Sequence, residues 1–174
     1  NQGCIHIYTG NGKGKTTAAL GLGLRAAGRE LSVWFCQFMK GRETGEQFSV
    51  EHLAGFTIRR FYRSDQFFAE LPKERQNEIA AEVRRGWSEL CREIAAGGPD
   101  ILVLDEIAAA MRQGVIPEKD VLALFEQKPE RMELILTGRA FPAKVLEKAD
   151  LITEMRCVRH YFDQGILARE GIEF

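Results

Sequence analysis

The stretch that decides the fold is residues 5–17, with the sequence IHIYTGNGKGKTT. It runs from a short β-forming segment into a loop with three glycines in five residues, and then into the Ala- and Leu-rich residues 18–27. A phosphate-binding loop requires this order of strand, loop and helix. Glycines let the backbone approach an anion closely, and a helix N-terminus adds partial positive charge. We therefore predict a nucleotide-phosphate site here, the alternative being an ordinary glycine-rich turn.

Two side chains of the loop have the chemistry that such a site needs. Lys15 supplies a point charge for phosphate oxygens, and the hydroxyl of Thr16 can bind Mg²⁺. The general pattern G-x-x-x-x-G-K-[ST] places its first glycine at residue 9, where this chain has Thr9. The loop therefore departs from the general pattern at one position, while it carries additional glycines at 10 and 12.

A second informative stretch is residues 101–106, ILVLDE, in which four apolar residues precede two carboxylates. In P-loop proteins a buried strand next to the loop strand brings a carboxylate to the Mg²⁺. The metal needs hard oxygen ligands of this kind. We assign Asp105 and Glu106 jointly to a magnesium site with Thr16, one directly and the other through water or Thr16. The sequence does not order the two acids, and an apolar run before Asp-Glu is also common by chance.

The remaining chain alternates between predicted strands and helices. Apolar runs predict further strands at 31–36, 133–137 and 151–153, the last as a core strand, and residues 57–62 predict a strand with mixed faces. Pro72 is expected to begin a long helix with one apolar stripe, which Gly97 ends. This alternation predicts an α/β fold with a single doubly wound, mostly parallel sheet, similar to P-loop NTPases of the RecA type.

Polar side chains follow several of the predicted strands. In open α/β sheets, ligands gather at the carboxyl ends of the strands. Gln37 and Lys40 are expected there, although Lys40 fits a solvated loop equally well. Arg139 suits an anionic ligand or a structural ion pair. The predicted edge is a site for a magnesium–nucleoside triphosphate, but no residue that would orient water or a hydroxyl for γ-phosphate transfer can be identified.

Composition bounds the class of protein. The 174 residues are expected to form one nucleotide-binding domain, 1–174, and the net charge of −1 gives no overall basic field for nucleic acid. Four cysteines without a C-x-x-C pair predict reduced, buried thiols in a cytoplasmic protein. No apolar run of 18 residues and no secretion signal is found, so no membrane contact is expected.

Several segments together resemble one family, the P-loop type of ATP:corrinoid adenosyltransferases, which act on cob(I)alamin or cob(I)yrinic acid a,c-diamide. The resemblance extends from residue 5 to the C-terminus, and Thr9 matches this family's own loop. The segments that carry it are 9–19 (TGNGKGKTTAA), 37–41 (QFMKG), 104–106 (LDE), 136–139 (LTGR), 149–154 (ADLITE), 160–165 (HYFDQG) and 171–174 (GIEF).

The resemblance implies an unusual reaction. A reduced Co(I) corrinoid attacks the 5′ carbon of the ATP ribose, triphosphate leaves, and a Co–C bond forms. Cobalt is the nucleophile, so no general base is needed, and the protein contributes positioning and charge stabilisation. The implied phosphate-binding residues are Gly10, Asn11, Gly12, Lys13, Gly14, Lys15, Thr16 and Thr17.

The resemblance also implies roles for single side chains. Lys15, Thr16 and Glu106 are the implied catalytic residues, with Thr16 and Glu106 at the metal. Arg25, at a position matched in the family, is expected to reach the nucleotide.

For the corrinoid, the resemblance is less complete. Family members often carry a Gly-Phe-Thr-Trp segment whose aromatic side chains cover the lower face of the corrin, whereas residues 65–68 of this chain are DQFF. Phe67 or Phe68 is expected to take this role, the alternative being that both pack in the core. Lys40 and His160 are weaker candidates for corrinoid contact.

Two other functions compete with adenosyl transfer. One is a P-loop ATPase or kinase acting at the γ-phosphate, and the other is a RecA-like nucleic-acid-binding module. The near-neutral charge counts against the second. The family further implies a homodimer and a flavoprotein or similar electron donor. Whether the corrinoid is complete cobalamin or a biosynthetic precursor stays open.

Overall fold

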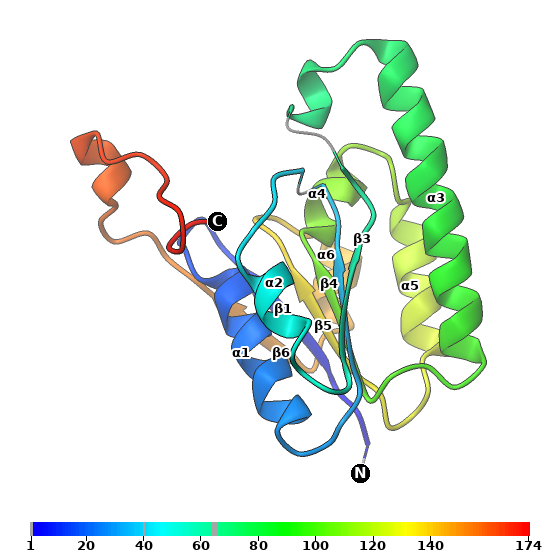
Figure 1. Ribbon diagram of the computed structural model, residues 1–174. Coiled ribbons are helices and arrows are strands. Elements are labelled where there is room, and N and C mark those ends of the chain that lie inside the picture. Colours follow the sequence, from blue (N-terminus) through cyan, green and yellow to red (C-terminus); the bar gives the residue numbers. More distant parts are fainter. Residues whose placement is uncertain (1, 40, 64–65) are drawn as a thin grey trace.

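The computed structural model describes residues 2–39, 41–63 and 66–174. Its centre is a six-stranded sheet in which every pair of neighbouring strands is parallel, in the order β3-β2-β4-β5-β1-β6 (Figure 1). The strands are β1 (Ile5–Thr9), β2 (Val33–Gln37), β3 (Phe56–Arg60), β4 (Ile101–Asp105), β5 (Glu133–Thr137) and β6 (Leu151–Glu154).

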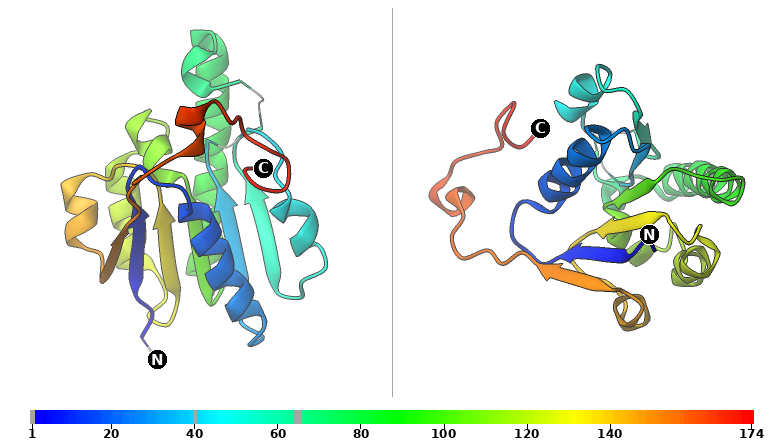
Figure 2. Two further views of the ribbon diagram at one scale, coloured as in Figure 1. Left: turned by 90° about the vertical axis from the view of Figure 1, so that its left-hand side faces the viewer. Right: turned by 90° about the horizontal axis from the view of Figure 1, so that it is seen from below.

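Helices cover both faces of the sheet, which confirms the predicted doubly wound α/β fold (Figures 1 and 2). The α-helices are α1 (Lys15–Ala27), α2 (Glu46–Val50), α3 (Lys73–Ala95), α4 (Ile107–Arg112), α5 (Glu118–Gln127) and α6 (Ala143–Glu147). Two short 3₁₀ helices, η1 (Phe68–Glu70) and η2 (Tyr161–Gln164), complete the described elements.

The alternation of side chains along β4 shows how the two cores form. Leu102 and Leu104 belong to the cluster beneath α3, α4, α5 and α6, whereas Ile101 and Val103 belong to the cluster beneath α1 and α2. Successive strand residues point to opposite faces, so a strand buried on both sides must be apolar throughout. The continuous apolar runs of the sequence follow from this arrangement.

The long helix α3 matches its prediction closely. Pro72 is its N-cap, and its buried residues include Ile79, Val83, Trp87 and Leu90, which recur at helical spacing. Pro is suited to this position because it lacks an N–H and the first N–H groups of a helix have no partner inside it. Trp87 is therefore a core residue that packs edge-on against the ring of Phe38.

The strand order corrects one expectation. The strand of Asp105 was expected beside the loop strand, but β5 lies between them and pairs with both β1 and β4. The carboxylate still reaches the loop because α1 packs across β5, β4 and β2 and because all strands end at one edge. Local sequence predicts a strand but contains no information about which strands become neighbours.

The prediction of a core strand at 151–153 is wrong in one respect. The strand exists as β6, but all four of its residues are exposed. It lies at the edge of the sheet and pairs with β1 alone among the described strands. Leu151 and Ile152 keep 40% and 48% of their surface accessible. The apolar composition of this segment therefore predicts the strand correctly but not its exposure.

Among the described residues, no helix combines the length and the apolar character needed to cross a membrane.

Candidate functional site

The start of the loop explains why Thr9 can replace a glycine. Thr9 is the last residue of β1 and pairs with Glu154 of β6, so its backbone is extended. The turn begins one residue later at Gly10, whose φ is 96°. L-residues with a side chain rarely adopt this conformation. The loop therefore places its first glycine one position after that of the general pattern.

Gly12 is required for a different reason, which is close packing. A Cβ atom at this position would lie 2.7 Å from the carbonyl carbon of Arg156 and 2.8 Å from the carbonyl oxygen of Met155. The Gly12 N–H donates to the same Met155 oxygen at 2.7 Å. The backbone that follows β6 thus lies directly against the loop, which accounts for the additional glycines.

Lys15 is enclosed by the loop that it follows. Its side chain is buried, and its Nζ donates to the carbonyl oxygens of Gly10 and Gly12, each at 2.7 Å. Burial lowers the pKa of Lys15, while the nearby Glu106 carboxylate raises it. The ammonium group is thus held in the concave side of the loop, where a phosphate oxygen can replace the two carbonyls.

A chain of hydrogen bonds connects the loop helix to the ends of β4 and β5. The hydroxyls of Thr16 and Thr137 both donate to Oδ1 of Asp105, at 2.8 and 2.7 Å. The N–H of Glu106 donates to Oγ1 of Thr137 at 2.9 Å. Asp105 is fully buried, so these bonds fix its carboxylate and the rotamer of Thr16.

The two carboxylates that the sequence could not order take different positions. Glu106 has a left-handed backbone with φ 58° and ψ 25°, and its residue lines the cavity over the loop. Such a conformation is uncommon for a residue other than glycine and is concentrated at functional sites. Asp105 lies behind Thr16, in the interior, and is not among the cavity residues.

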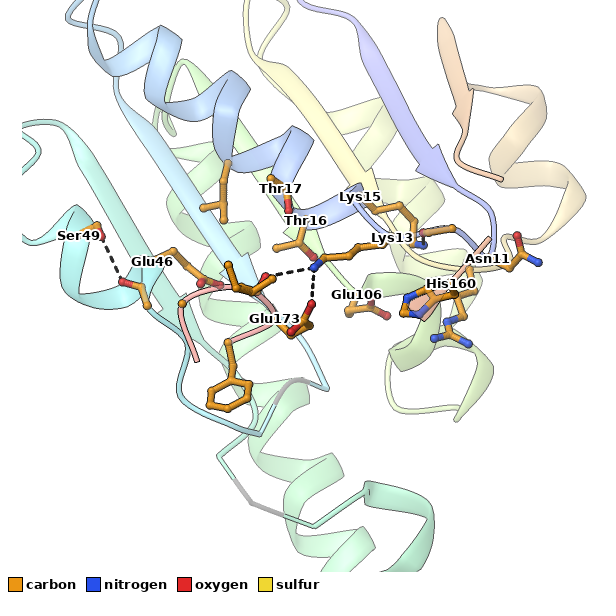
Figure 3. Close-up of a pocket in the computed structure, with 18 residues that line it drawn as sticks. Asn11, Lys13, Lys15, Thr16, Thr17, Glu46, Ser49, Glu106, His160 and Glu173 are labelled. Carbon is orange, nitrogen blue, oxygen red and sulfur yellow. Dashed lines mark hydrogen bonds and ion pairs between the residues drawn. The ribbon is translucent and has the colours of Figure 1, made fainter. Parts of the chain in front are cut away.

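The cavity over the loop has a volume of about 700 Å³ (Figure 3). It brings together most of the predicted phosphate-binding residues with Glu106, Arg139 and His160. Its residues are Asn11, Gly12, Lys13, Gly14, Lys15, Thr16, Thr17, Leu20, Gly45, Glu46, Ser49, Glu106, Arg139, His160, Gly171, Ile172, Glu173 and Phe174.

The C-terminal segment, residues 160–174, forms one wall of this cavity. It leaves the sheet after β6 and folds back over the N-terminal end of α1 (Figures 1 and 2). Lys13 donates to the Glu173 carboxylate at 2.6 Å and to the Tyr161 hydroxyl at 2.8 Å, as Figure 3 shows for Glu173. Glu173 also accepts from Tyr161 and from the N–H of Arg169.

These contacts shift the pKa values of two side chains at the mouth of the cavity. Hydrogen bonds from Lys13 and Tyr161 hold the pKa of Glu173 well below its usual range, and Glu173 raises the pKa of Lys13. Sequence reasoning gave no role to Tyr161 or Glu173. Both residues lie in segments that carry the family resemblance, 160–165 and 171–174, and this could have identified them as candidates.

The whole chain, residues 1–174, matches the family model of ATP:corrinoid adenosyltransferase BtuR/CobO/CobP. The chain belongs to this family. Corrinoid adenosyltransferases of Escherichia coli strain K12 and Salmonella typhimurium are each 34% identical over 99% of this chain and 86% of their own length. That of Pseudomonas aeruginosa is 32% identical over 99% of this chain and 84% of its own length.

Among solved structures, domain III of the replication initiation protein DnaA of Thermotoga maritima aligns with a TM-score of 0.46 and 16% identity. The alignment covers 89% of this chain and 55% of that one. A likeness of this size carries no argument about function.

Two described residues that were candidates for the ligand site, Arg25 and Gln37, do not line the cavity. Arg25 is exposed in the last turn of α1 and does not line it. Gln37 is buried at the end of β2, where its amide donates to Glu46 at 3.0 Å. Lys40 lies outside the described residues. Contact between Arg25 and the nucleotide stays a prediction.

The pair of phenylalanines expected at the corrin divides between core and surface. Phe68 is buried against the ring of Tyr62, so it cannot cover the face of a ligand without leaving the core. The 3₁₀ turn η1 begins at Phe68 and directs it inward, whereas Phe67 precedes this turn and is 77% exposed. The exposed Phe67 therefore stays a candidate for corrin contact, whereas Phe68 matches the alternative of core packing.

His160 lies at the cavity, but its ring is already engaged. Its Nδ1 accepts the N–H of Phe162 at 3.1 Å, which caps η2. This contact fixes the ring orientation and leaves Nε2 for another partner. Contact with the corrinoid stays a prediction for His160.

The acids near the loop suit magnesium better than a metal that needs a full set of protein ligands. The described residues contain no group of three or more His, Cys, Asp or Glu side chains that could hold a metal. Mg²⁺ instead binds through one or two carboxylates, substrate phosphates and water. Thr16, Asp105 and Glu106 are a donor set of that kind.

The four cysteines are free, as predicted. Their burial differs, however: Cys36 is buried and Cys157 is exposed. Cys4 and Cys91 are partly buried, so the prediction of buried thiols holds fully for Cys36 and is wrong for Cys157.

Proposed function

We propose that the chain transfers the 5′-deoxyadenosyl group of ATP to the Co(I) of a reduced corrinoid and releases triphosphate. The observation that carries the proposal is the enclosed Lys15 beside the ordered Thr16, at the N-terminus of α1, in a chain of the corrinoid adenosyltransferase family. An alternative that acts at the γ-phosphate, or a nucleic-acid-binding module, is not favoured.

The reaction defines what the loop must do. The Co(I) electron pair forms a bond to C5′ of the ribose, the C5′–O bond breaks, and its electron pair leaves on triphosphate. Negative charge therefore grows on the bridging oxygen next to the ribose. In this proposal the loop N–H groups and Lys15 bind that leaving group, and fixed donors of this kind stabilise developing charge strongly.

Magnesium fits the acids and the hydroxyl at this edge of the sheet. We infer that Thr16 and Glu106 hold it directly and that Asp105 acts through Thr16, because Glu106 lines the cavity and Asp105 lies behind Thr16. When bound, Mg²⁺ neutralises charge on the triphosphate. Thr137 orients both acids, through Oδ1 of Asp105 and the N–H of Glu106.

Several further properties are part of the same proposal. The 174 residues act as one nucleotide-binding domain, cytoplasmic, with a flavoprotein or similar donor that reduces the corrinoid. The functional form is a homodimer, which the exposed apolar edge strand β6, with Leu151 and Ile152, supports as a contact surface.

The test is incubation with MgATP and chemically reduced cob(I)alamin, in which the cobalt spectrum and the phosphate products are followed together. We expect the spectrum of an alkylated corrinoid and one triphosphate for each corrinoid consumed. ADP and phosphate without a spectral change would favour γ-phosphate chemistry. Thr16→Ala, which removes one hydroxyl at the metal, is the matched loss-of-function variant.

A further inference from the structure

A second cavity of about 840 Å³ adjoins the nucleotide cavity. The two share Gly45, Gly171 and Phe174 in their walls. The second cavity is formed by the segment before α2, the end of β3 and the C-terminal segment. Its residues are Gly41, Arg42, Glu43, Thr44, Gly45, Phe48, Arg60, Arg63, Glu170, Gly171 and Phe174.

Three arginines, Arg42, Arg60 and Arg63, face this cavity, and within the described residues none of them forms an ion pair. Arg42 stacks on the ring of Phe174, with 3.4 Å from its guanidinium carbon to the ring centre. Arg60 donates to neutral groups, the Gly41 carbonyl at 2.5 Å and the Gln47 amide oxygen at 3.3 Å.

These guanidinium groups therefore retain donors for an anion. Stacking on an aromatic ring orients a guanidinium but leaves its N–H groups at the edge available. The planar fork of arginine matches a carboxylate with two parallel hydrogen bonds. Glu43 and Glu170 also line the cavity, yet no described ion pair joins either of them to the three arginines.

The position of the cavity identifies its occupant, on the assumption of the proposed function. The corrinoid must bring its cobalt to C5′ of the ATP ribose, so its site must adjoin the nucleotide cavity. The rim of a corrin carries acetate and propionate side chains, present either as acids or as neutral amides. Phe48, which is 59% exposed, and Phe174 add apolar surface for a macrocycle.

We propose that Arg42, Arg60 and Arg63 bind peripheral carboxylates of the corrinoid and so select incompletely amidated corrinoids over fully amidated ones. The triphosphate of ATP is the other anion nearby, but it already has the loop N–H groups, Lys13 and Lys15. The three arginines lie beyond that loop, on the other side of the wall at Gly45, Gly171 and Phe174.

The test compares two chemically reduced substrates under saturating MgATP: cob(I)yrinic acid a,c-diamide, which has free carboxylates, and cob(I)inamide, in which they are amidated. We expect kcat/KM to be at least about tenfold higher for the acid, because hydrogen bonds to a charged partner are worth that much. Raising the KCl concentration should reduce this ratio, since salt screens the attraction.

The variants Arg63→Gln and Arg42→Gln each remove one guanidinium. We expect each to lower the ratio of the two kcat/KM values about tenfold, mainly through KM of the acid. Arg42→Lys, which keeps the charge, should retain part of the preference. Arg112→Gln, which removes an arginine at the end of α4, should leave the ratio unchanged because Arg112 lines neither cavity.

Equal kcat/KM values for the two corrinoids would overturn the inference while leaving adenosyl transfer intact. A weaker ATP affinity of Arg63→Gln with an unchanged ratio would also overturn it, since the arginines would then serve triphosphate. Adenosylation of neither corrinoid, without triphosphate release, would instead contradict the proposed function itself.

Discussion

The floor and the C-terminal wall of the nucleotide cavity are held together by different kinds of contact. The floor consists of Lys15, Thr16, Asp105 and Thr137, whose hydrogen bonds are buried or partly buried. The wall is the segment 160–174, most of whose residues are exposed and whose polar contacts with the loop lie at the surface.

The difference teaches which part of the site is ready for a ligand and which part must respond to one. Buried hydrogen bonds keep their geometry because water does not compete for them. Exposed ion pairs are weak and are screened by salt. In the wall, Glu173 gives Lys13 a carboxylate where a phosphate would otherwise bind. We therefore expect a fixed floor and a displaceable wall.

The largest effect is expected from Lys15→Ala in the floor. Loss of a buried cation that faces the leaving triphosphate should reduce the rate of adenosyl transfer about 10²- to 10³-fold. Lys13→Ala is the matched control in the same loop and should cost less than about tenfold. The measurement is triphosphate release with cob(I)alamin, with thermal melts to confirm folding. Similar losses for both lysines would contradict a division between floor and wall.

A smaller effect is expected from Asp105→Asn, which keeps the shape of the side chain but removes its charge. In the proposed site Asp105 holds the Thr16 hydroxyl that would bind Mg²⁺, and loss of a partner that orients a metal ligand typically weakens metal binding about 10- to 100-fold. The apparent Mg²⁺ concentration for half-maximal activity should rise accordingly. Asp120→Asn in α5 is the control, and an unchanged Mg²⁺ requirement for Asp105→Asn would disprove this role.

The floor could largely be predicted from the sequence, because its signals are local. Gly-Lys-Thr before a helix and an apolar run before Asp-Glu identify Lys15, Thr16 and Asp105 without knowledge of the fold. What the sequence could not give was the different placement of Glu106, at the cavity, and Asp105, in the interior. That placement depends on the left-handed backbone at Glu106 and on the bond from its N–H to Thr137, 31 residues away.

The wall could not be predicted, because its contacts join distant parts of the chain. Lys13 and Glu173 are 160 residues apart, and neither is in a pattern that indicates the other. The same limit applies to β5, whose insertion between β1 and β4 depends on pairing across the sheet. Apolar composition likewise predicted β6 as a strand but not its exposed position.

A modest effect in the opposite direction is expected from Glu173→Gln. Removal of the carboxylate frees Lys13, so ATP should bind more tightly, by up to about fivefold, the range of an exposed ion pair. The dissociation constant of MgATP from calorimetry measures this change. Asp163→Asn removes a charge from the same segment without contacting Lys13 and should leave affinity unchanged. Weaker ATP binding by Glu173→Gln would mean that the wall assists binding.

The same contact has a predictable pH dependence. Lys13 and Tyr161 lower the pKa of Glu173, so their contact stabilises the docked wall above the ordinary glutamate pKa of about 4.3. This stabilisation is lost as the pH falls through the lowered pKa of Glu173. A carboxyl NMR titration should therefore place the pKa of Glu173 well below the ordinary glutamate range. In Lys13→Ala the midpoint should move upward, and an unchanged midpoint would contradict the ion pair.

The smallest functional effect is expected from thiol labelling. The labelling compares Cys36, which is buried in the core, with Cys157, which is exposed just before the wall segment 160–174. Burial raises the pKa of the Cys36 thiol to about 12, so it should stay unreactive toward iodoacetamide at pH 8 until the protein unfolds. Cys157 is exposed and should react within minutes, with little change in ATP affinity because only its backbone N–H contacts the loop, at Asn11. Mass spectrometry of labelled peptides distinguishes the two. If Cys36 were labelled as fast as Cys157, the core around β2 would have to become accessible to solvent as readily as the wall segment, which would contradict this comparison.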